Sequence, residues 1–240
     1  MQAGDEPLQS RPESISGLSI ASVTEVVYEH LRKQILTGMQ PGQPLRLNTL
    51  AAELGVSTTP VRMALEKLGA DGLVLQEGRR SATVAPLSLA DFKDIYAVRR
   101  CLEGAAARAG TARMDTQDRS AMMAQHQILD EMASRADPDL DRYLEVEWRM
   151  HEICYEAAGH PRMLREIQSF RRQAERYFRL ALTEGMNFLE DLEHQREFFH
   201  ACYRGDAEAA EDVATALLDW TVERVAPILA HSGAMASSTV

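Results

Sequence analysis

The sequence predicts a mostly α protein, in which a small N-terminal domain of three helices and a two-stranded ribbon precedes an antiparallel bundle of about six helices. Apolar residues recur at the i, i+3 and i+4 spacing of amphipathic helices through most of the chain. Strand-like pieces and frequent glycine turns occur only before Pro86, and no segment of about 20–50 residues repeats, which favours a bundle over a solenoid. We expect four segments: a flexible tail (1–21), the small domain (22–86), the bundle (87–230) and a second flexible tail (231–240).

The small domain has the element order of a winged helix-turn-helix. Its first helix should run from Val23 to Leu36 with Ser22 as the N-cap. The later elements follow as a short extended piece at Pro44–Leu47, a helix around Leu50–Leu54, a tight turn at Gly55–Ser57, a helix at Thr59–Asp71, and strands at Leu73–Leu75 and Ser81–Val84. In such a domain the third helix enters the major groove of DNA, and the ribbon, or wing, can lie on the phosphates or enter the minor groove. The same pattern also fits a three-helix domain that binds another protein.

The bundle shows helical periodicity throughout. Good caps such as Ser88 and Asp206, and Pro161 in a first turn, set the expected starts. The six expected helices are Ser88–Gly110, Asp115–Arg135, Asp137–Ala158, Pro161–Thr183, Asn187–Arg204 and Asp206–Ala230.

Composition narrows the class of protein. No run approaches the ~18 apolar residues of a membrane helix, and the first 20 residues lack the apolar core of a secretory signal. Cys101, Cys154 and Cys202 are too few and too scattered for a disulfide framework, so we expect them to be buried and reduced. The sequence therefore predicts a cytoplasmic protein with no membrane partner.

The net charge of −10 is unevenly distributed. The small domain holds seven Lys and Arg residues against six Asp and Glu, so the acidic excess belongs to the tail and the bundle. A near-neutral N-terminal domain can approach a polyanion such as DNA while an acidic body keeps the chain soluble.

Residues in both the small domain and the bundle resemble a known protein family. The segment Leu50–Leu65, LAAELGVSTTPVRMAL, resembles the most specific stretch of the GntR family of bacterial transcriptional regulators, and Asp71–Val74 resembles the lead-in to that family's wing. The following helices resemble the FCD-type ligand-sensing domain of the FadR subfamily, on the residues Tyr96, Arg99, Leu102, Glu103, Glu147, His151 and His194 and the phrase Arg204–Ala210. The resemblance covers roughly residues 22–228.

Two positions depart from the family pattern. Thr58 stands where family members usually carry an arginine, so we expect a changed operator and not a loss of DNA binding. Leu217 stands where metal-binding members place a histidine, so the expected ligand set is short by one imidazole.

Eight residues of the small domain are candidate DNA contacts. Arg62 is the strongest, because it lies on the exposed flank of the third helix, and hydroxyls cluster at that helix's N-terminus, where free N–H groups favour phosphate. The alternative role for the Ser57 and Thr59 hydroxyls is to cap the helix. The alternative for the wing arginines, Arg79 and Arg80, is a solvated charge pair without a DNA contact. The candidates are Arg46, Asn48, Ser57, Thr58, Thr59, Arg62, Arg79 and Arg80.

Glu147 and His151 lie four residues apart, on one helical face, and can share a ligand. With His194 from a later helix they could hold one divalent ion (zinc, nickel or manganese), leaving open positions for water or a carboxylate effector. The alternative is an internal Glu–His ion pair beside an unrelated polar histidine.

Arg99 is expected near the apolar stripe of its helix, where a lone cation is costly. An anionic effector would supply a bidentate partner, and an internal salt bridge is the alternative.

The resemblance implies a homodimeric, effector-responsive regulator, most often a repressor, that reads a palindromic operator in double-stranded DNA and is not an enzyme. A small carboxylate effector follows from Arg99 and the candidate metal. Two alternatives stay open: a metal-independent regulator that senses an apolar acyl ligand, which Leu217 would suit, and, remotely, a metal-dependent enzyme of the bundle with Glu147 as base.

Overall fold

The computed structural model describes residues 19–76, 78, 81–133, 139–185 and 188–237. By its internal contacts the chain divides into two compact units, Met1–Leu87 and Ser88–Val240. Each unit has its own core of buried apolar side chains. Within the described ranges no helix has the length and apolar character needed to cross a membrane.

Three helices and three strands build the N-terminal unit: α1 (Ile20–Thr37), β1 (Pro44–Arg46), α2 (Leu47–Leu54), α3 (Thr58–Ala70), β2 (Val74–Gln76) and β3 (Ser81–Val84). The first helix begins three residues before the predicted start. Ser19, and not Ser22, is its N-cap, because the Ser19 hydroxyl accepts a hydrogen bond from the Ser22 backbone N–H.

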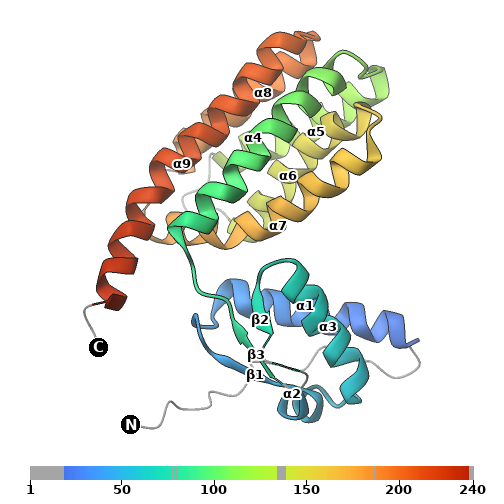
Figure 1. Cartoon of the computed structure of the whole chain (residues 1–240). Helices are drawn as coiled ribbons and strands as arrows, with labels where there is room; N and C mark the ends of the chain where they lie inside the picture. Colours follow the sequence, from blue (N-terminus) through green and yellow to red (C-terminus); the bar gives the residue numbers. More distant parts are fainter. Residues whose placement is uncertain (1–18, 77, 79–80, 134–138, 186–187, 238–240) are drawn as a thin grey trace. The chain divides into compact units, whose positions relative to one another are not determined.

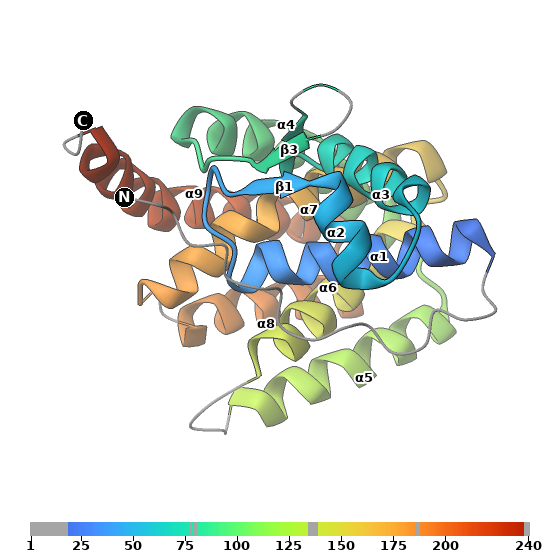
Figure 2. The same cartoon turned by 90° about the horizontal axis from the view of Figure 1, so that it is seen from below.

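The predicted two-stranded ribbon is a three-stranded antiparallel sheet in the order β1-β3-β2, and Figure 2 shows its neighbouring strands β1 and β3. The short piece before α2, predicted as extended, is the third strand, and Leu45 pairs with Ala82 across it. Leu45 and Ala82 are both buried, so burial of this apolar pair favours the extra strand.

The core of this unit is built by the inward faces of α1, α2, α3 and the sheet. Tyr28 of α1 donates a 2.5 Å hydrogen bond to the buried Asp71 carboxylate at the end of α3. This bond ties the first helix to the end of the third.

The second unit is an all-helical bundle of α4 (Leu89–Thr111), α5 (Thr116–Ala133), α6 (Leu140–Ala157), α7 (Pro161–Thr183), α8 (Phe188–Arg204) and α9 (Ala207–Ser237). The starts of α4, α5, α7 and α9 lie within one residue of those predicted, whereas the predicted starts Asp137 and Asn187 lie outside the described residues. Ser88 caps α4 by accepting a hydrogen bond from the Asp91 N–H. Figure 1 shows α4 and α9 running side by side. The last helix continues to Ser237, so residues 231–237, predicted as a flexible tail, are helical.

Two of the three cysteines are buried as expected, but Cys101 is exposed. The buried stripe of α4 includes Phe92, Tyr96, Arg99 and Glu103, and Cys101 lies on the other face of that helix.

Candidate DNA-contact surface and bundle pocket

The turn between α2 and α3 presents the start of α3 to solvent. Gly55 ends α2 in the left-handed region (φ +67°), and the Val56 N–H returns to the Ala51 carbonyl at 3.0 Å. Pro60 is buried in the first turn of α3, where its missing N–H costs nothing. The side chain of Ser57, the N-cap residue of α3, makes no capping hydrogen bond, so its hydroxyl is available to an outside partner.

The predicted DNA-contact residues that the structure describes lie at the starts of α2 and α3 or one turn into α3. Arg46 ends β1 and Asn48 lies in the first turn of α2. Four of them are exposed and lie close to the helix starts: Arg46, Asn48, Ser57 and Thr59. Arg62 is exposed one turn further along α3, and Thr58 is partly buried. Arg79 and Arg80 lie outside the described residues.

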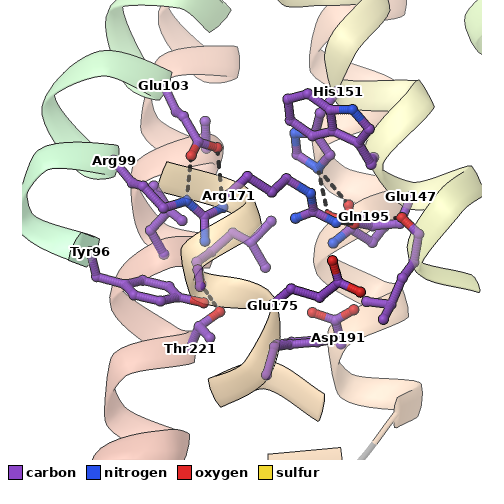
Figure 3. A pocket seen from close by; sticks show the side chains of 17 residues that line it. Tyr96, Arg99, Glu103, Glu147, His151, Arg171, Glu175, Asp191, Gln195 and Thr221 are labelled. Atoms are coloured by element: carbon purple, nitrogen blue, oxygen red, sulfur yellow. Dashed lines mark hydrogen bonds and ion pairs between the residues drawn. The ribbon is translucent and has the colours of Figure 1, made fainter. Parts of the chain in front are cut away.

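The bundle contains a pocket bordered by five of its helices, α4, α6, α7, α8 and α9 (Figure 3). Its empty space, including solvent at the open mouth, is about 570 Å³. The carboxylates that line it come from α4, α6, α7 and α8: Glu103, Glu147, Glu175 and Asp191. The lining also includes two arginines, Arg99 and Arg171.

Arg99 has an internal partner. Its guanidinium donates to Glu103 one turn along α4, with Nε 2.6 Å from Oε1, and both side chains are almost wholly buried. Burial alone would raise the pKa of Glu103, but the Arg99 charge lowers it below its usual value. Of the two predicted partners of Arg99, an anionic effector or an internal salt bridge, the salt bridge is the one observed, so Arg99 needs no anionic ligand as its partner.

Arg171 of α7 is the second cation of the pocket, and the sequence reasoning missed it. Its guanidinium binds the Glu147 carboxylate, also contacts the Leu144 carbonyl, and lies 5.0 Å from the centre of the Trp148 ring. Arg171 thus forms an ion pair with Glu147, the carboxylate that was predicted as a metal ligand.

His151 sits at the centre of a buried hydrogen-bond network. Its Nε2 lies 2.7 Å from the side-chain carbonyl oxygen of Gln195, and its Nδ1 lies 3.1 Å from the Tyr155 hydroxyl. Tyr155 in turn donates to Glu103. Burial lowers the pKa of His151 from its usual 6.5, so the ring is neutral at physiological pH.

Asp191 lies at the other end of this network. Its carboxylate accepts hydrogen bonds from the Tyr143 hydroxyl and from Gln195, and only 2% of the residue is exposed. Among the described residues it makes no ion pair. Burial, together with the nearby Glu147 charge, raises the pKa of Asp191 to about 7.

The predicted metal set is not assembled. Glu147 and His151 do approach each other, with 3.7 Å between Oε1 and Nε2, but Arg171 holds the first and Gln195 the second. His194 faces the Trp220 ring at 5.0 Å and pairs with Glu197 on its own helix, because it lies one position off the inward face of α8. In the part of the chain described, no group of three His, Cys, Asp or Glu side chains could hold a metal ion. The described residues therefore do not fit the predicted metal.

A signal for the missed residues was present in the sequence. The inward stripe of α8 follows the i, i+4, i+7 spacing, and Asp191, Gln195 and Phe198 fall on it. Gln195 is therefore the α8 residue that reaches His151, in place of the predicted His194.

The arrangement defines a class of protein: a winged helix-turn-helix, whose exposed third helix can read DNA, and an all-helical domain that contains a pocket lined by charged side chains. Comparison with known proteins agrees with this class. Residues 23–84 match the family of bacterial regulatory proteins described as gntR, and residues 94–219 match the FCD domain.

Relatives align along most of the chain. An uncharacterized HTH-type transcriptional regulator in an unstable DNA locus of Streptomyces ambofaciens is 28% identical over 207 residues, 86% of each chain. The HTH-type transcriptional repressor RspR of Escherichia coli K12 is 25% identical over 86% of this chain and 90% of its own. The solved structure of E. coli McbR/YncC shares the fold, with a TM-score of 0.72 at 20% identity over 88% of this chain and 98% of that chain.

This chain belongs to the GntR family of bacterial regulatory proteins, in the group that carries an FCD domain, and it is a DNA-binding transcriptional regulator and not an enzyme. The FCD domain agrees with the predicted FadR subfamily.

Proposed function

We propose that the protein is a cytoplasmic, homodimeric repressor that binds a palindromic operator and is controlled by a small molecule held in the bundle pocket. The exposed N-terminal end of α3, with Arg62 on its outer flank, is the observation that carries the DNA-binding part. The name of RspR, a repressor that aligns along most of the chain, supports the direction of regulation.

The chemistry of the α3 start supports a contact with DNA. Arg62 is exposed and makes no hydrogen bond or ion pair within the described ranges, so its guanidinium can form a bidentate contact with guanine. The Ser57 and Thr59 hydroxyls lie where the free N–H groups and the helix dipole attract phosphate.

A dimer follows from the way such a domain reads DNA. A two-fold symmetric protein places two recognition helices on two half-sites, so the operator repeats with the same symmetry. Arg79 and Arg80 fall between β2 and β3 in the sequence, outside the described residues, and we keep them as predicted backbone contacts of the wing.

The pocket supports control by a small polar molecule. Its buried carboxylates and guanidinium groups make an apolar acyl ligand unfavourable, because such a ligand would strip water from charges without replacing its hydrogen bonds. An effector of this kind can regulate only as far as it binds one arrangement of the dimer better than another.

The DNA-binding part is tested with Arg62→Ala and the matched control Lys33→Ala, which removes the same charge from the exposed face of α1. Fluorescence anisotropy with labelled DNA from the gene's own upstream region, at one fixed salt concentration, measures the affinity. We expect Arg62→Ala to lose about 1–3 kcal/mol of specific binding, and Lys33→Ala to bind like the parent protein. Equal affinity of Arg62→Ala and the parent protein would contradict the assignment.

A further inference from the structure

We propose that the bundle pocket binds a small organic cation, an alkylammonium or quaternary ammonium compound, whose nitrogen pairs with the Asp191 carboxylate. The inference rests on the proposed function, because it names the chemical class of the effector. It replaces the organic acid expected from the sequence.

The charges of the pocket argue for a positive ligand. Four carboxylates line it against two guanidinium groups. Each arginine has its own carboxylate, Arg99 on Glu103 and Arg171 on Glu147. Neither cation is left over for an anionic ligand, which would instead add to a surplus of negative charge in a poorly hydrated space.

Asp191 is the carboxylate that lacks a cation. Glu175 is paired with Arg179 at 2.8 Å, whereas the hydrogen-bond partners of Asp191, Tyr143 and Gln195, are both neutral. Burying an ionised carboxylate without a positive partner is costly, and a bound ammonium group would supply that partner.

The rest of the lining suits the carbon part of an organic cation. Three aromatic side chains border the pocket: Tyr96, Trp148 and Phe178. Two of these rings already attract guanidinium groups, Tyr96 with Arg99 at 4.7 Å and Trp148 with Arg171 at 5.0 Å, so their π faces favour positive charge here. Leu217 and Leu218 of α9 add apolar surface for alkyl groups.

The ionisation of Asp191 makes binding depend on pH. With a pKa of about 7, the carboxylate is mostly protonated at pH 6 and mostly ionised at pH 8. The groups that face it from the packed helices are Tyr143 and Glu147 on α6, Arg171 on α7 and Gln195 on α8. Burial raises the pKa of Tyr143 and lowers that of His151, so both groups titrate further from pH 7 than they would without burial. We expect affinity for a cation to rise about tenfold from pH 6 to pH 8.

The test is calorimetric titration of the full-length protein with matched probes at equal ionic strength. The probes are butylammonium, butan-1-ol and butyrate, together with choline and its neutral isostere 3,3-dimethylbutan-1-ol. We expect at least one of the two cations to bind at pH 8 at least tenfold more tightly than its neutral isostere, and butyrate not to bind. Tighter binding of butyrate than of butylammonium, or no binding of either cation at 10 mM, would overturn the proposal.

Asp191→Asn and Glu193→Gln are the matched variants. Each removes one negative charge from α8, but Asp191 lines the pocket and Glu193 is exposed. The preference for the cation should disappear in Asp191→Asn and persist in Glu193→Gln, and an unchanged preference in Asp191→Asn would overturn the proposal. If Asp191→Asn does not fold, the tenfold pH effect on the parent protein decides the matter, since a pH-independent affinity is incompatible with pairing to Asp191.

These measurements are made without DNA, so the two proposals fail separately. A protein that binds its upstream DNA but no cation disproves only the ligand class. A protein that binds the cation but not DNA disproves the proposed DNA recognition.

Discussion

Asp191 shows how a single buried side chain links stability to function. Its carboxylate is enclosed by α6, α7 and α8, and its hydrogen-bond partners are neutral. A carboxylate in this setting disfavours its ionised form, so the folded protein carries an electrostatic cost at neutral pH until a cation arrives. The same feature that destabilises the empty pocket would strengthen ligand binding.

A stability measurement follows from the raised pKa. In the unfolded chain Asp191 loses its proton near its ordinary pKa of 3.8, and in the folded chain near 7. Between these values the folded state holds a proton that the unfolded state has lost, so the free energy of unfolding falls as pH rises through this range and levels off above it. We expect Asp191→Asn to gain stability over the parent protein at pH 8, by up to about 4 kcal/mol, and less at pH 5. Urea unfolding at both pH values measures this, and a pH-independent difference would refute it.

At the residue scale, spacing alone predicted some contacts and missed others. The placement of Glu147 and His151 on one face of α6 is confirmed, because helical periodicity alone determines it. The partners of these residues depend on the rotation of other helices about their axes. Because of that rotation, His151 contacts Gln195 and not His194, and Glu147 contacts Arg171 in place of the predicted metal. For Arg99, the salt bridge that the sequence left as an alternative is the one that forms.

At the scale of the elements, helix positions were predictable and strand pairing was not. The interval Pro161–Thr183 predicted for α7 is the observed one, because proline at the start and an amphipathic stripe define it locally. The pairing of β1 with β3 joins residues almost forty positions apart, and a three-residue strand carries no periodic signal. The extended piece was therefore predicted, but its pairing with β3 was not.

Glycines in α4 set how closely neighbouring helices approach. A Cβ atom at Gly110 would lie 1.9 Å from the backbone oxygen of Cys154 on α6, and one at Gly104 would lie 2.8 Å from a methyl group of Thr215 on α9. Backbone cannot move aside as a side chain can, so the two positions differ in tolerance.

We therefore expect Gly110→Ala to cost about 3 kcal/mol or more, and Gly104→Ala to cost less because Thr215 can change rotamer. Gly69→Ala in α3 serves as the control, since its nearest neighbour would be a Gln76 side-chain carbon at 3.6 Å and alanine favours a helix by up to about 1 kcal/mol. Chemical denaturation of the three variants gives the order. Parent-like stability of Gly110→Ala would show that α4 and α6 can separate at little cost.

At the scale of the whole molecule, the two units have separate cores. All buried residues of one core lie between Val23 and Val84, and all those of the other lie between Ala106 and Ala214. The near-neutral charge of the N-terminal domain and the acidic charge of the bundle follow the same division. A ligand in the pocket stabilises the bundle directly, so its effect on DNA binding must be transmitted from the bundle to the N-terminal unit.

This division predicts two unfolding transitions, of which the ligand shifts one. Both tryptophans, Trp148 and Trp220, lie in the bundle, so tryptophan emission follows bundle unfolding alone, whereas circular dichroism follows the helices of both units. A cation at about one hundred times its dissociation constant adds about 2.7 kcal/mol to the bundle, which raises its midpoint by roughly 5–10 °C. The transition seen only by circular dichroism should keep its midpoint. If both probes report one coincident transition that the ligand shifts as a whole, the units unfold together, and a ligand in the bundle then stabilises the DNA-binding domain as well.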